Sequence, residues 1–462
     1  MNSKNAYLQL SKTTRKRLKT LLGERFLEAP EDLKAYAFDA SGHEFLPSAV
    51  ALPQTAAEVQ KIVLLAREEP FPIIPRGAGT STTAAPLAVK GGLVLSMCRM
   101  DRILEINPQD LVAVVEPGVF TGKLKKEVAK QGLFYPPDPA SYPFSTIGGN
   151  VATGAGGPKG LKYGVTKDYV LGLEVVLPSG DKVFLGTRTA KGVVGYDLVH
   201  LFVGSEGTLG IITKIVLKLL PLPPAQAVVV AGFTKLEEAV TAFGQVLQSG
   251  VLPSTAELMD EITLEATKKL RPSSLIPDNI KALILFELDG TPTALKEEVF
   301  LLHKALKKAP LYQEAWTETD QEALWEIRRS ISPALKALGP KKMADDIVVP
   351  RSRLVEFVHF VKALQTTNNL LIACFGHLGD GNLHVNILFD PQKEPLEKVK
   401  GVREKLLQKV LALSGTISGE HGIGLAKRAY LPWEIPPKVC QIMYQLKQVF
   451  DPQNIMNPHK VL

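Results

Sequence analysis

The chain has 462 residues, of which 45% are apolar and 22% are charged. This length exceeds what one hydrophobic core usually holds and predicts two or three domains, and the composition excludes a largely disordered chain. The net charge of +7 is spread along the chain without an aromatic-interleaved basic stripe, which argues against a nucleic-acid-binding protein. Scattered solvated lysines are the simplest interpretation, with a basic face for an acidic partner or anionic substrate as the alternative.

The three cysteines, Cys98, Cys374 and Cys440, form no CxxC pattern. This excludes a Cys-ligated iron–sulfur cluster within the chain and is typical of a reducing compartment. No window has the length and apolarity of a transmembrane helix, so we expect a cytoplasmic protein, with peripheral association with a membrane, for example through a partner, as the alternative. Residues 1–44 predict a helical lead-in, with an Arg/Lys-bearing transit sequence as the alternative.

Strand and helix signals alternate in residues 47–95, as at the start of a βαβ unit. AVALP predicts a short strand, and TAAEVQKIVLLAREE predicts a helix capped by Thr55. FPII predicts a second strand, which runs into a glycine turn. Short strands and one helix follow, then a glycine-rich stretch at 145–163 and a hairpin around Pro178–Asp181. The proline cluster at 221–224 predicts a domain boundary.

Beyond this boundary the pattern changes to strand, helix, strand, and then strand and helix again. The runs AVVVAGF, STAELMD and KALILFELDG read as strands that form a ferredoxin-like layer with their helices. A single helix is expected across LWEIRRSISPALKAL, followed by the short strand DDIVVP. The last segment predicts a helix that ends in a turn-rich tail.

The stretch Leu371–Asp390 predicts a β-hairpin that carries two histidines. Asp380-Gly381 lies between alternating apolar residues, and Asp-Gly is a strong signal for a two-residue turn. A turn centred there pairs residues whose numbers sum to 761, so His377 and His384 would stand directly opposite each other. Two facing imidazoles are close enough for one cation. The alternative for any single histidine is an ordinary core or surface residue.

The motif Ser418–Gly424, SGEHGIG, is the candidate source of a third metal ligand. Glu420 and His421 are neighbours, so an extended backbone directs their side chains to opposite sides. One of them would bind the metal, and the other would face the reacting group.

Arg76-Gly77-Ala78-Gly79-Thr80 follows the predicted strand FPII directly. Such a turn aims successive backbone N–H groups at one point and suits a phosphate or pyrophosphate. The glycines match neither GxGxxG nor the P-loop, so the motif is weak by itself. Two further glycine stretches, GGNVATGAGG and VGSEGTLG, make a group of three such motifs, which is stronger evidence than one. A folded glycine-rich stretch indicates close approach of the backbone to a ligand.

The motifs PRGAGTS, PPDP, STIGGNVATGAGGPKGLKY and GSEGTLGI together resemble the FAD-binding domain of the vanillyl-alcohol-oxidase/PCMH-type flavoproteins. GHLGDGNLH, SGEHGIG and MNPHKVL are similar to one branch, which contains D-lactate dehydrogenases, the glycolate oxidase catalytic subunit and D-2-hydroxyglutarate dehydrogenase. The resemblance implies an α+β protein: a PCMH-type FAD-binding domain of two α/β subdomains at 45–221, a ferredoxin-like α+β cap domain with the metal hairpin at 222–415, and a C-terminal segment at 416–462 that returns to the flavin.

The resemblance also implies the residues that bind FAD. Those expected at the pyrophosphate are Arg76, Gly77, Ala78, Gly79, Thr80 and Ser81. Those expected along the ribityl chain and the isoalloxazine are Pro137, Asp138, Thr146, Gly148, Gly149, Asn150 and Gly156. Those expected near the adenine and over the flavin are Glu206, Gly207, Ile212 and Asn457. Several relatives attach the flavin through a histidine where Thr80 stands here, so we expect a non-covalent cofactor.

For the metal, the resemblance implies a divalent ion (Zn, Mn, Fe or Co) held by His377, His384 and Glu420. The ion would lower the pKa of the substrate hydroxyl, His421 would act as general base, and a hydride would pass to flavin N5. Arg328 matches a carboxylate-binding arginine, and Ser332, one turn on, would add a hydrogen bond. Without the resemblance, Arg328 reads as a surface helix charge.

The expected reaction is oxidation of a D-2-hydroxy acid, with D-lactate or glycolate favoured. Ala344 to Asp346 stand where relatives often have a lysine for a second carboxylate, which disfavours D-2-hydroxyglutarate. The electron acceptor would be an iron–sulfur subunit, an electron-transfer flavoprotein, a quinone or a cytochrome, and a homodimer is compatible. A flavin-carrying electron-transfer subunit and an ether-lipid synthase relative are the other interpretations.

Overall fold

The computed structural model describes residues 10–270 and 276–462, which form two compact units. The second unit comprises Gly157–Gly164 and Pro223–Gly419, and the first unit comprises the rest. The chain therefore passes between the units four times. The expected domain limits differ from this division, because they assign 157–164 to the first domain and end the second at 415. The first nine residues, which include Leu8 of the expected leading helix, lie outside the described part.

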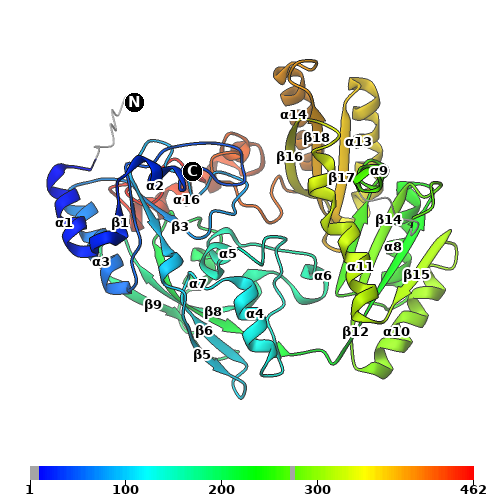
Figure 1. Ribbon diagram of the computed structural model, residues 1–462, viewed down its shortest axis with the longest axis horizontal. Coiled ribbons are helices and arrows are strands. Elements are labelled where there is room, and N and C mark those ends of the chain that lie inside the picture. Colours follow the sequence, from blue (N-terminus) through cyan, green and yellow to red (C-terminus); the bar gives the residue numbers. More distant parts are fainter. Residues whose placement is uncertain (1–9, 271–275) are drawn as a thin grey trace. The chain divides into compact units, whose positions relative to one another are not determined.

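The first unit contains a four-stranded sheet of order β1-β2-β4-β3, in which β4 runs parallel to both β2 and β3 (Figure 1). Its strands are β1 (Phe26–Leu27), β2 (Ala49–Ala51), β3 (Ile73–Arg76) and β4 (Leu93–Ser96). Successive side chains alternate between the two faces of this sheet. Ile73, Leu93 and Leu95 pack with helices α1 (Lys12–Leu22) and α3 (Ala56–Glu68), whereas Ile74 and Val94 pack on the other face. Thr55 caps α3, as predicted, by accepting the N–H of Glu58.

A second, antiparallel sheet of the first unit has the order β5-β6-β10-β8-β9. Its strands are β5 (Ile103–Asn107), β6 (Val112–Val115), β8 (Val170–Val176), β9 (Lys182–Gly186) and β10 (Ile211–Lys218). The β8–β9 pair is the hairpin predicted around Pro178–Asp181. The remaining elements of this unit are α2 (Pro30–Lys34), α4 (Thr121–Ala129), β7 (Leu133–Phe134), α5 (Ile147–Thr153), α7 (Leu198–Phe202), β11 (Leu220–Pro221), α15 (Leu431–Glu434) and α16 (Pro437–Phe450).

The C-terminal tail closes the first sheet of this unit. Met456 forms a parallel bridge with Ile73, and the backbone of Ile73 bonds to Ile455 and Asn457 at 2.8 and 2.9 Å. The buried Lys447 ammonium donates to the carbonyls of Thr208 and Met456 and thereby fixes the end of α16.

The second unit is built on one seven-stranded sheet of order β15-β12-β14-β13-β17-β18-β16, with every pairing antiparallel (Figure 1). Its strands are β12 (Ala225–Phe233), β13 (Thr255–Met259), β14 (Ala282–Gly290), β15 (Leu311–Ala315), β16 (Lys341–Val348), β17 (Leu371–His377) and β18 (Asn382–Phe389). The first four strands in sequence have the ferredoxin-like order 4-1-3-2, in agreement with the predicted ferredoxin-like layer, although β15 was not among the predicted strands. The last three strands extend the sheet beyond β13.

Helices cover both faces of this sheet. The helices of the second unit are α6 (Gly160–Tyr163), α8 (Leu236–Gln248), α9 (Glu261–Leu270), α10 (Pro292–Ala305), α11 (Glu318–Arg329), α12 (Ile331–Leu335), α13 (Leu354–Asn368) and α14 (Leu396–Ala412). The single helix expected across LWEIRRSISPALKAL is in fact two, α11 and α12, joined at Ser330. Pro333 accounts for the break, because its ring would clash with the carbonyl of Arg329 in a continuous helix.

The register predicted for the histidine hairpin is wrong. Leu378–Asp380 forms a 3-10 turn and Gly381 has a positive φ of 74°, so four residues, not two, connect the strands. His377 consequently pairs with Asn382, and His384 pairs with Phe375. His384 lies two residues beyond Asn382 and therefore on the same sheet face as His377, so the two rings remain neighbours, with centroids 5.1 Å apart.

Candidate functional site

The RGAGTS turn begins at the carboxyl end of β3, where a parallel strand of a sheet typically presents a ligand site. Arg76 ends the strand, and its side chain is buried and donates to the Phe38 carbonyl at 2.9 Å. Among the described residues, Arg76 Nη1 has no hydrogen-bond partner. Burial of a guanidinium with one nitrogen unsatisfied is costly, so this atom marks a place for an anionic or polar ligand.

The glycine-rich stretch folds into α5, which Thr146 caps by accepting the N–H of Gly149 at 3.2 Å. Its glycines allow close backbone contacts. A Cβ on Gly77 would lie 2.2 Å from Thr146 Oγ1, and a Cβ on Gly148 would lie 2.5 Å from Pro117 Cβ. The RGAGTS turn and the start of α5 are therefore packed together, as the prediction of a folded glycine constellation requires.

Glu206 joins three segments of the first unit. Its buried carboxylate accepts the N–H groups of Ile423 at 2.8 Å and Gly424 at 2.9 Å, which lie in the SGEHGIG loop. Its own N–H donates to Ala152, and its carbonyl accepts from Asn457 Nδ2 at 2.7 Å. Burial raises the pKa of Glu206, and the two loop N–H groups oppose this shift. The expectation that Glu206 lies near the adenine stays a prediction, and in the structure its carboxylate holds the loop that carries Glu420 and His421.

Asn457 is buried in the C-terminal tail and directly follows Met456, which bridges to β3. Its Nδ2 donates to the carbonyls of Ala85 and Glu206, and its Oδ1 has no hydrogen-bond partner among the described residues. The other expected FAD residues lie in the first unit as well. Asn150 donates to Thr121, and Ile212 packs in the antiparallel-sheet core. Those half-buried in loops or at the start of α5 are Gly77, Ala78, Gly79, Thr80, Ser81, Asp138, Gly148 and Gly149, and those buried are Pro137, Gly156 and Gly207.

In the second unit, two rungs of the sheet bring polar side chains to one face. Glu257 pairs with His377, and His377 pairs with Asn382. The neighbouring rung joins Phe375, His384 and Asp346. Directly paired residues of an antiparallel sheet share a face, as do residues two apart in one strand. Glu257, His377, His384 and Asp346 therefore form a polar row across β13, β17, β18 and β16, in which His384 is half-buried and the other three are buried.

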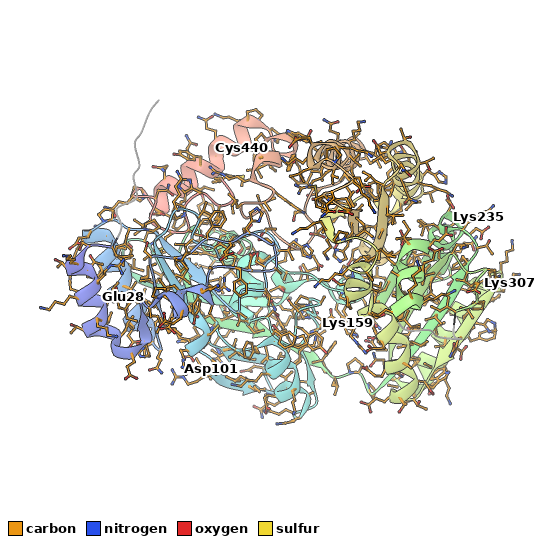
Figure 2. The ribbon with its side chains drawn as sticks, turned by 45° about the horizontal axis from the view of Figure 1, so that its top comes forward. Glu28, Asp101, Lys159, Lys235, Lys307 and Cys440 are labelled. Atoms are coloured by element: carbon orange, nitrogen blue, oxygen red, sulfur yellow. The ribbon has the colours of Figure 1, made fainter. Side chains whose placement is uncertain are left out.

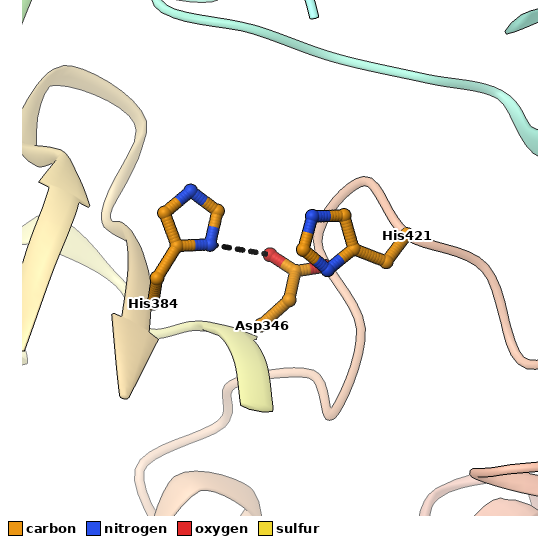
Figure 3. A group of neighbouring side chains, drawn as sticks. All are labelled: Asp346, His384 and His421. Atoms are coloured by element: carbon orange, nitrogen blue, oxygen red, sulfur yellow. Dashed lines mark ion pairs between the residues drawn. The ribbon is translucent and has the colours of Figure 1, made fainter. Parts of the chain in front are cut away.

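Asp346 is fully buried beside His384, with its Oδ1 3.9 Å from His384 Nδ1 (Figure 3). It accepts Asn382 Nδ2 at 2.6 Å and the N–H of Gly419 at 2.9 Å. Residues Thr416 and Val348 exchange two backbone hydrogen bonds just before this contact. The segment that precedes Glu420 is thus hydrogen-bonded to β16 as far as Gly419, the last residue of the second unit.

Glu257 is fully buried and bonds to two side chains, His377 and Arg328. One oxygen bonds to His377 Nδ1, and the other accepts Arg328 Nε at 2.5 Å. Burial would raise the pKa of Glu257, but the His377 and Arg328 charges and hydrogen bonds together outweigh it and lower the pKa to about 2. Arg328 also stacks over Phe375, with its guanidinium carbon 4.9 Å from the ring centroid. Arg328 is therefore fixed within the second unit and is not the free surface charge that its helix position alone would suggest.

Ser332 does not join this row. It is exposed on α12, whereas the neighbouring Ser330 is buried and caps the end of α11 through its backbone. At the other end of the row, Lys159, the N-cap residue of α6 (Figure 2), forms an ion pair with the buried Glu287 on β14. Lys162 and Tyr163 of the same short helix bond to Asp289 at 2.6 and 2.8 Å.

Sequence reasoning missed Glu257 and the positioning contacts of Asp346. A signal for Glu257 was present in STAELMD, because Thr255 and Glu257 place polar groups on one face of an otherwise apolar strand. Buried charges occur mainly where they are paired. The partners, however, come from residues 71 and 120 positions away, which no local pattern reveals.

The residues present fit the two groups that the resemblance implies. In the first unit, Arg76 Nη1 and Asn457 Oδ1 have no hydrogen-bond partner among the described residues. The glycine turns of this unit also leave no room for a Cβ at Gly77 or Gly148. These features suit a polar cofactor. In the second unit, a carboxylate bonds to Nδ1 of His377, which is the arrangement that orients a histidine ligand toward a metal, and a second carboxylate lies 3.9 Å from Nδ1 of the neighbouring His384.

Comparison with known families agrees with this architecture. Residues 47–186 match the FAD binding domain, and residues 222–461 match the family described as FAD linked oxidases, C-terminal domain. The fold and the first site thus define an FAD-dependent oxidoreductase. The chain belongs to the FAD-linked oxidase family.

Curated relatives align over nearly the whole chain. The glycolate oxidase subunit GlcD of Bacillus subtilis is 39% identical over 442 residues, which cover 95% of this chain and 94% of that protein. The D-lactate dehydrogenase of Anaerostipes hadrus is 33% identical over 425 residues, which cover 90% and 89%. Among solved structures, p-cresol methylhydroxylase has a TM-score of 0.81 at 18% identity, with 99% and 98% covered, and so shares the fold. No helix in residues 10–270 and 276–462 has the length and apolarity to cross a membrane.

Proposed function

We propose that the protein oxidises a D-2-hydroxy acid, with D-lactate or glycolate favoured, to the corresponding 2-oxo acid, using non-covalent FAD and a divalent metal. The observation that carries this proposal is the polar row that sets His377 and His384 side by side, with Glu257 bonded to Nδ1 of His377 and Asp346 3.9 Å from Nδ1 of His384. The names of relatives, a glycolate oxidase subunit and a D-lactate dehydrogenase, supply the substrate class.

The metal would be held by His377, His384 and Glu420, with Zn, Mn, Fe or Co compatible with this donor set. The argument for Glu420 rests on chain connectivity. Gly419 is anchored to Asp346, which lies beside His384, and Glu420 follows through one peptide bond, with a Cα–Cα distance of about 3.8 Å. Three protein ligands leave a position for substrate, which is typical of catalytic metal sites.

When bound, the metal supplies Lewis acidity at the substrate hydroxyl, and the flavin accepts the hydride. The chain supplies the remaining functions. Arg328 would hold the substrate carboxylate through Nη1 and Nη2, since its Nε is bonded to Glu257. The His421 imidazole would take the hydroxyl proton. Glu206 would hold the loop that presents His421.

The experiment is anaerobic reduction of the bound flavin by D-lactate, L-lactate, glycolate and D-2-hydroxyglutarate, before and after removal of metal with a chelator. Bleaching by D-lactate or glycolate that disappears on chelation and returns with added metal supports the proposal. Bleaching that is unchanged by chelation overturns the metal's role. D-2-hydroxyglutarate should react poorly, because Ala344 of β16 offers no cation to a second carboxylate.

A second candidate function is that of a flavin-carrying subunit that transfers electrons within a larger complex. The word subunit in the names of the GlcD relatives favours an assembly with an electron acceptor, for example an iron–sulfur subunit. A pure carrier does not need the histidine row. If no hydroxy acid reduces the flavin while a chemical reductant does, this function replaces the first. The ether-lipid synthase interpretation has only fold-level support, from alkyldihydroxyacetonephosphate synthase at 21% identity and a TM-score of 0.74.

A further inference from the structure

Glu257 bonds to two residues of the second unit that have different roles in the proposed function. His377, on β17, is a proposed metal ligand, and Arg328, on α11, is the proposed carboxylate-binding residue. Each of the two Glu257 oxygens bonds to one of them. The carboxylate is fully buried, and its two partners come from two different later elements, the helix α11 and the strand β17.

The backbone leaves this arrangement little freedom. Glu257 and His377 are directly paired in the sheet, so the distance between their Cα atoms is fixed by the ladder. Arg328 is held from a second side by Phe375, which lies on the same strand and face as His377, two residues before it. The guanidinium is therefore located relative to β17 by two independent contacts.

The nitrogens that bond to Glu257 determine which nitrogens of His377 and Arg328 remain available to a metal or a substrate. A bond at His377 Nδ1 selects Nε2 as the metal-binding nitrogen. A bond at Arg328 Nε selects Nη1 and Nη2, the planar pair that binds a carboxylate in two-pronged fashion. One carboxylate thus sets the orientation of a cation site and of an anion site together.

We propose that Glu257 is a positioning residue that sets the spacing between the metal site and the Arg328 guanidinium, and thereby selects acids with the hydroxyl and carboxylate on adjacent carbons. This inference rests on the proposed function. A 3-hydroxy acid carries one more carbon between the two groups, a difference in reach of up to one C–C bond length, about 1.5 Å. A rigidly spaced site discriminates against that difference, because a misplacement of about 1 Å is enough to cost 100-fold in rate.

The test uses the full-length protein with Glu257→Gln and Glu257→Asp. Both partners of Glu257 are donors, so the amide of Gln can satisfy only one of them, while Asp keeps the charge and shortens the reach by one methylene. Glu287→Gln is the matched control. Glu287 is another buried carboxylate on the adjacent strand β14, and it bonds to Trp325, Lys159 and Ser254 but not to the two residues in question.

Two quantities are measured for each variant. The first is the Zn²⁺ affinity of the metal-free protein, by competition with a chromogenic chelator. The second is the ratio of kcat/KM for D-lactate to that for 3-hydroxypropionate. We expect Glu257→Gln to weaken Zn²⁺ binding 10- to 100-fold, and both Glu257 variants to lower the kcat/KM ratio at least 10-fold. Glu287→Gln should leave both quantities within twofold.

Unchanged Zn²⁺ affinity and an unchanged ratio in both Glu257 variants would overturn the inference, and equal effects in Glu287→Gln would reduce Glu257 to a structural role. Should the wild-type protein oxidise no hydroxy acid at all, the proposed function fails, and the Zn²⁺ affinities still decide whether Glu257 positions His377. If Glu257→Gln does not fold, Glu257→Asp carries the same comparison.

Discussion

Asp346 accepts the backbone N–H of Gly419 at 2.9 Å, and so a carboxylate beside His384 fixes the residue that directly precedes Glu420. The same side chain accepts Asn382 Nδ2. One buried acid thereby holds a strand, a hairpin and the SGEHGIG segment in register with one another.

The first prediction concerns Asp346. Asp346→Ala removes the acceptor of the Gly419 N–H and one of the two acceptors of the buried Asn382 amide, which keeps the Ile347 carbonyl. The bond lost by the buried amide costs about 1–3 kcal/mol. We expect a lower thermal midpoint and weaker metal retention, whereas Asp346→Asn keeps one acceptor and loses less. Scanning calorimetry and metal analysis after dialysis measure both effects. Full metal retention by Asp346→Ala would separate this residue from the metal site.

The second prediction distinguishes two roles for Glu206. If its carboxylate mainly holds the SGEHGIG loop, Glu206→Gln should speed hydrogen exchange at the amides of Ile423 and Gly424 while flavin content stays near one per chain. Its turnover should fall at least 10-fold, because the loop carries Glu420 and His421. Loss of flavin with unchanged exchange would instead support the contact with the cofactor that the family resemblance implies.

The third prediction tests the glycine packing. Gly77→Ala places a methyl group 2.2 Å from Thr146 Oγ1, so the threonine must leave its capping position at α5. Loss of such a cap costs about 0.5–2 kcal/mol, and we expect weaker flavin binding as well. Gly401→Ala is the control, because its Cβ meets nothing within 4 Å on helix α14 and should be neutral or stabilising. Flavin release on dilution, followed by fluorescence, compares the two variants.

The fourth prediction concerns pH and Asp260. Burial raises the pKa of Asp260 to about 6, against the N–H bonds from Thr263 and Cys374. The folded state thus favours the protonated acid more than the unfolded state does. Asp260 consequently lowers stability as pH rises from about 4 to 6, by up to about 3 kcal/mol. The difference in melting temperature between wild type and Asp260→Asn should change across this pH range and become constant above it. A constant difference from pH 4 to 7 would contradict the raised pKa.

The fifth prediction assigns the proton acceptor. His421→Ala should keep its flavin and its metal but lose at least 100-fold in the rate of flavin reduction by D-lactate. His377→Ala should lose metal and keep flavin. Stopped-flow absorbance with metal analysis on the same samples compares them. Near-normal flavin reduction by His421→Ala would exclude this histidine as the base.

The local elements could be predicted from sequence because local chemistry decides them. The strand FPII, the Thr55 cap and the ferredoxin-like strand order follow from apolar periodicity, capping and short connections. The hairpin register was wrong because Leu378 and Gly379 joined the turn, which Asp380-Gly381 alone did not indicate. The numbers of paired residues sum to two less than predicted. A register shift of two residues keeps every side chain on its own face of the sheet, so His377 and His384 still lie together. Glu257 and Asp346 were missed as positioning residues because their partners are brought together only by the seven-stranded sheet.

The pairing of the tail with β3 bears on how the protein is made. Ile73 bonds to Ile455 and Asn457, so the first sheet is complete only after residue 457 has been synthesised. The second unit likewise needs the segment Gly157–Gly164, without which Glu287 and Asp289 would be buried without their lysine partners. Neither unit is a continuous piece of chain that can fold during translation and wait for the other. We therefore expect the polypeptide to take up FAD after release from the ribosome, and a gene cut at residue 222 to give two insoluble halves that become productive only when expressed together.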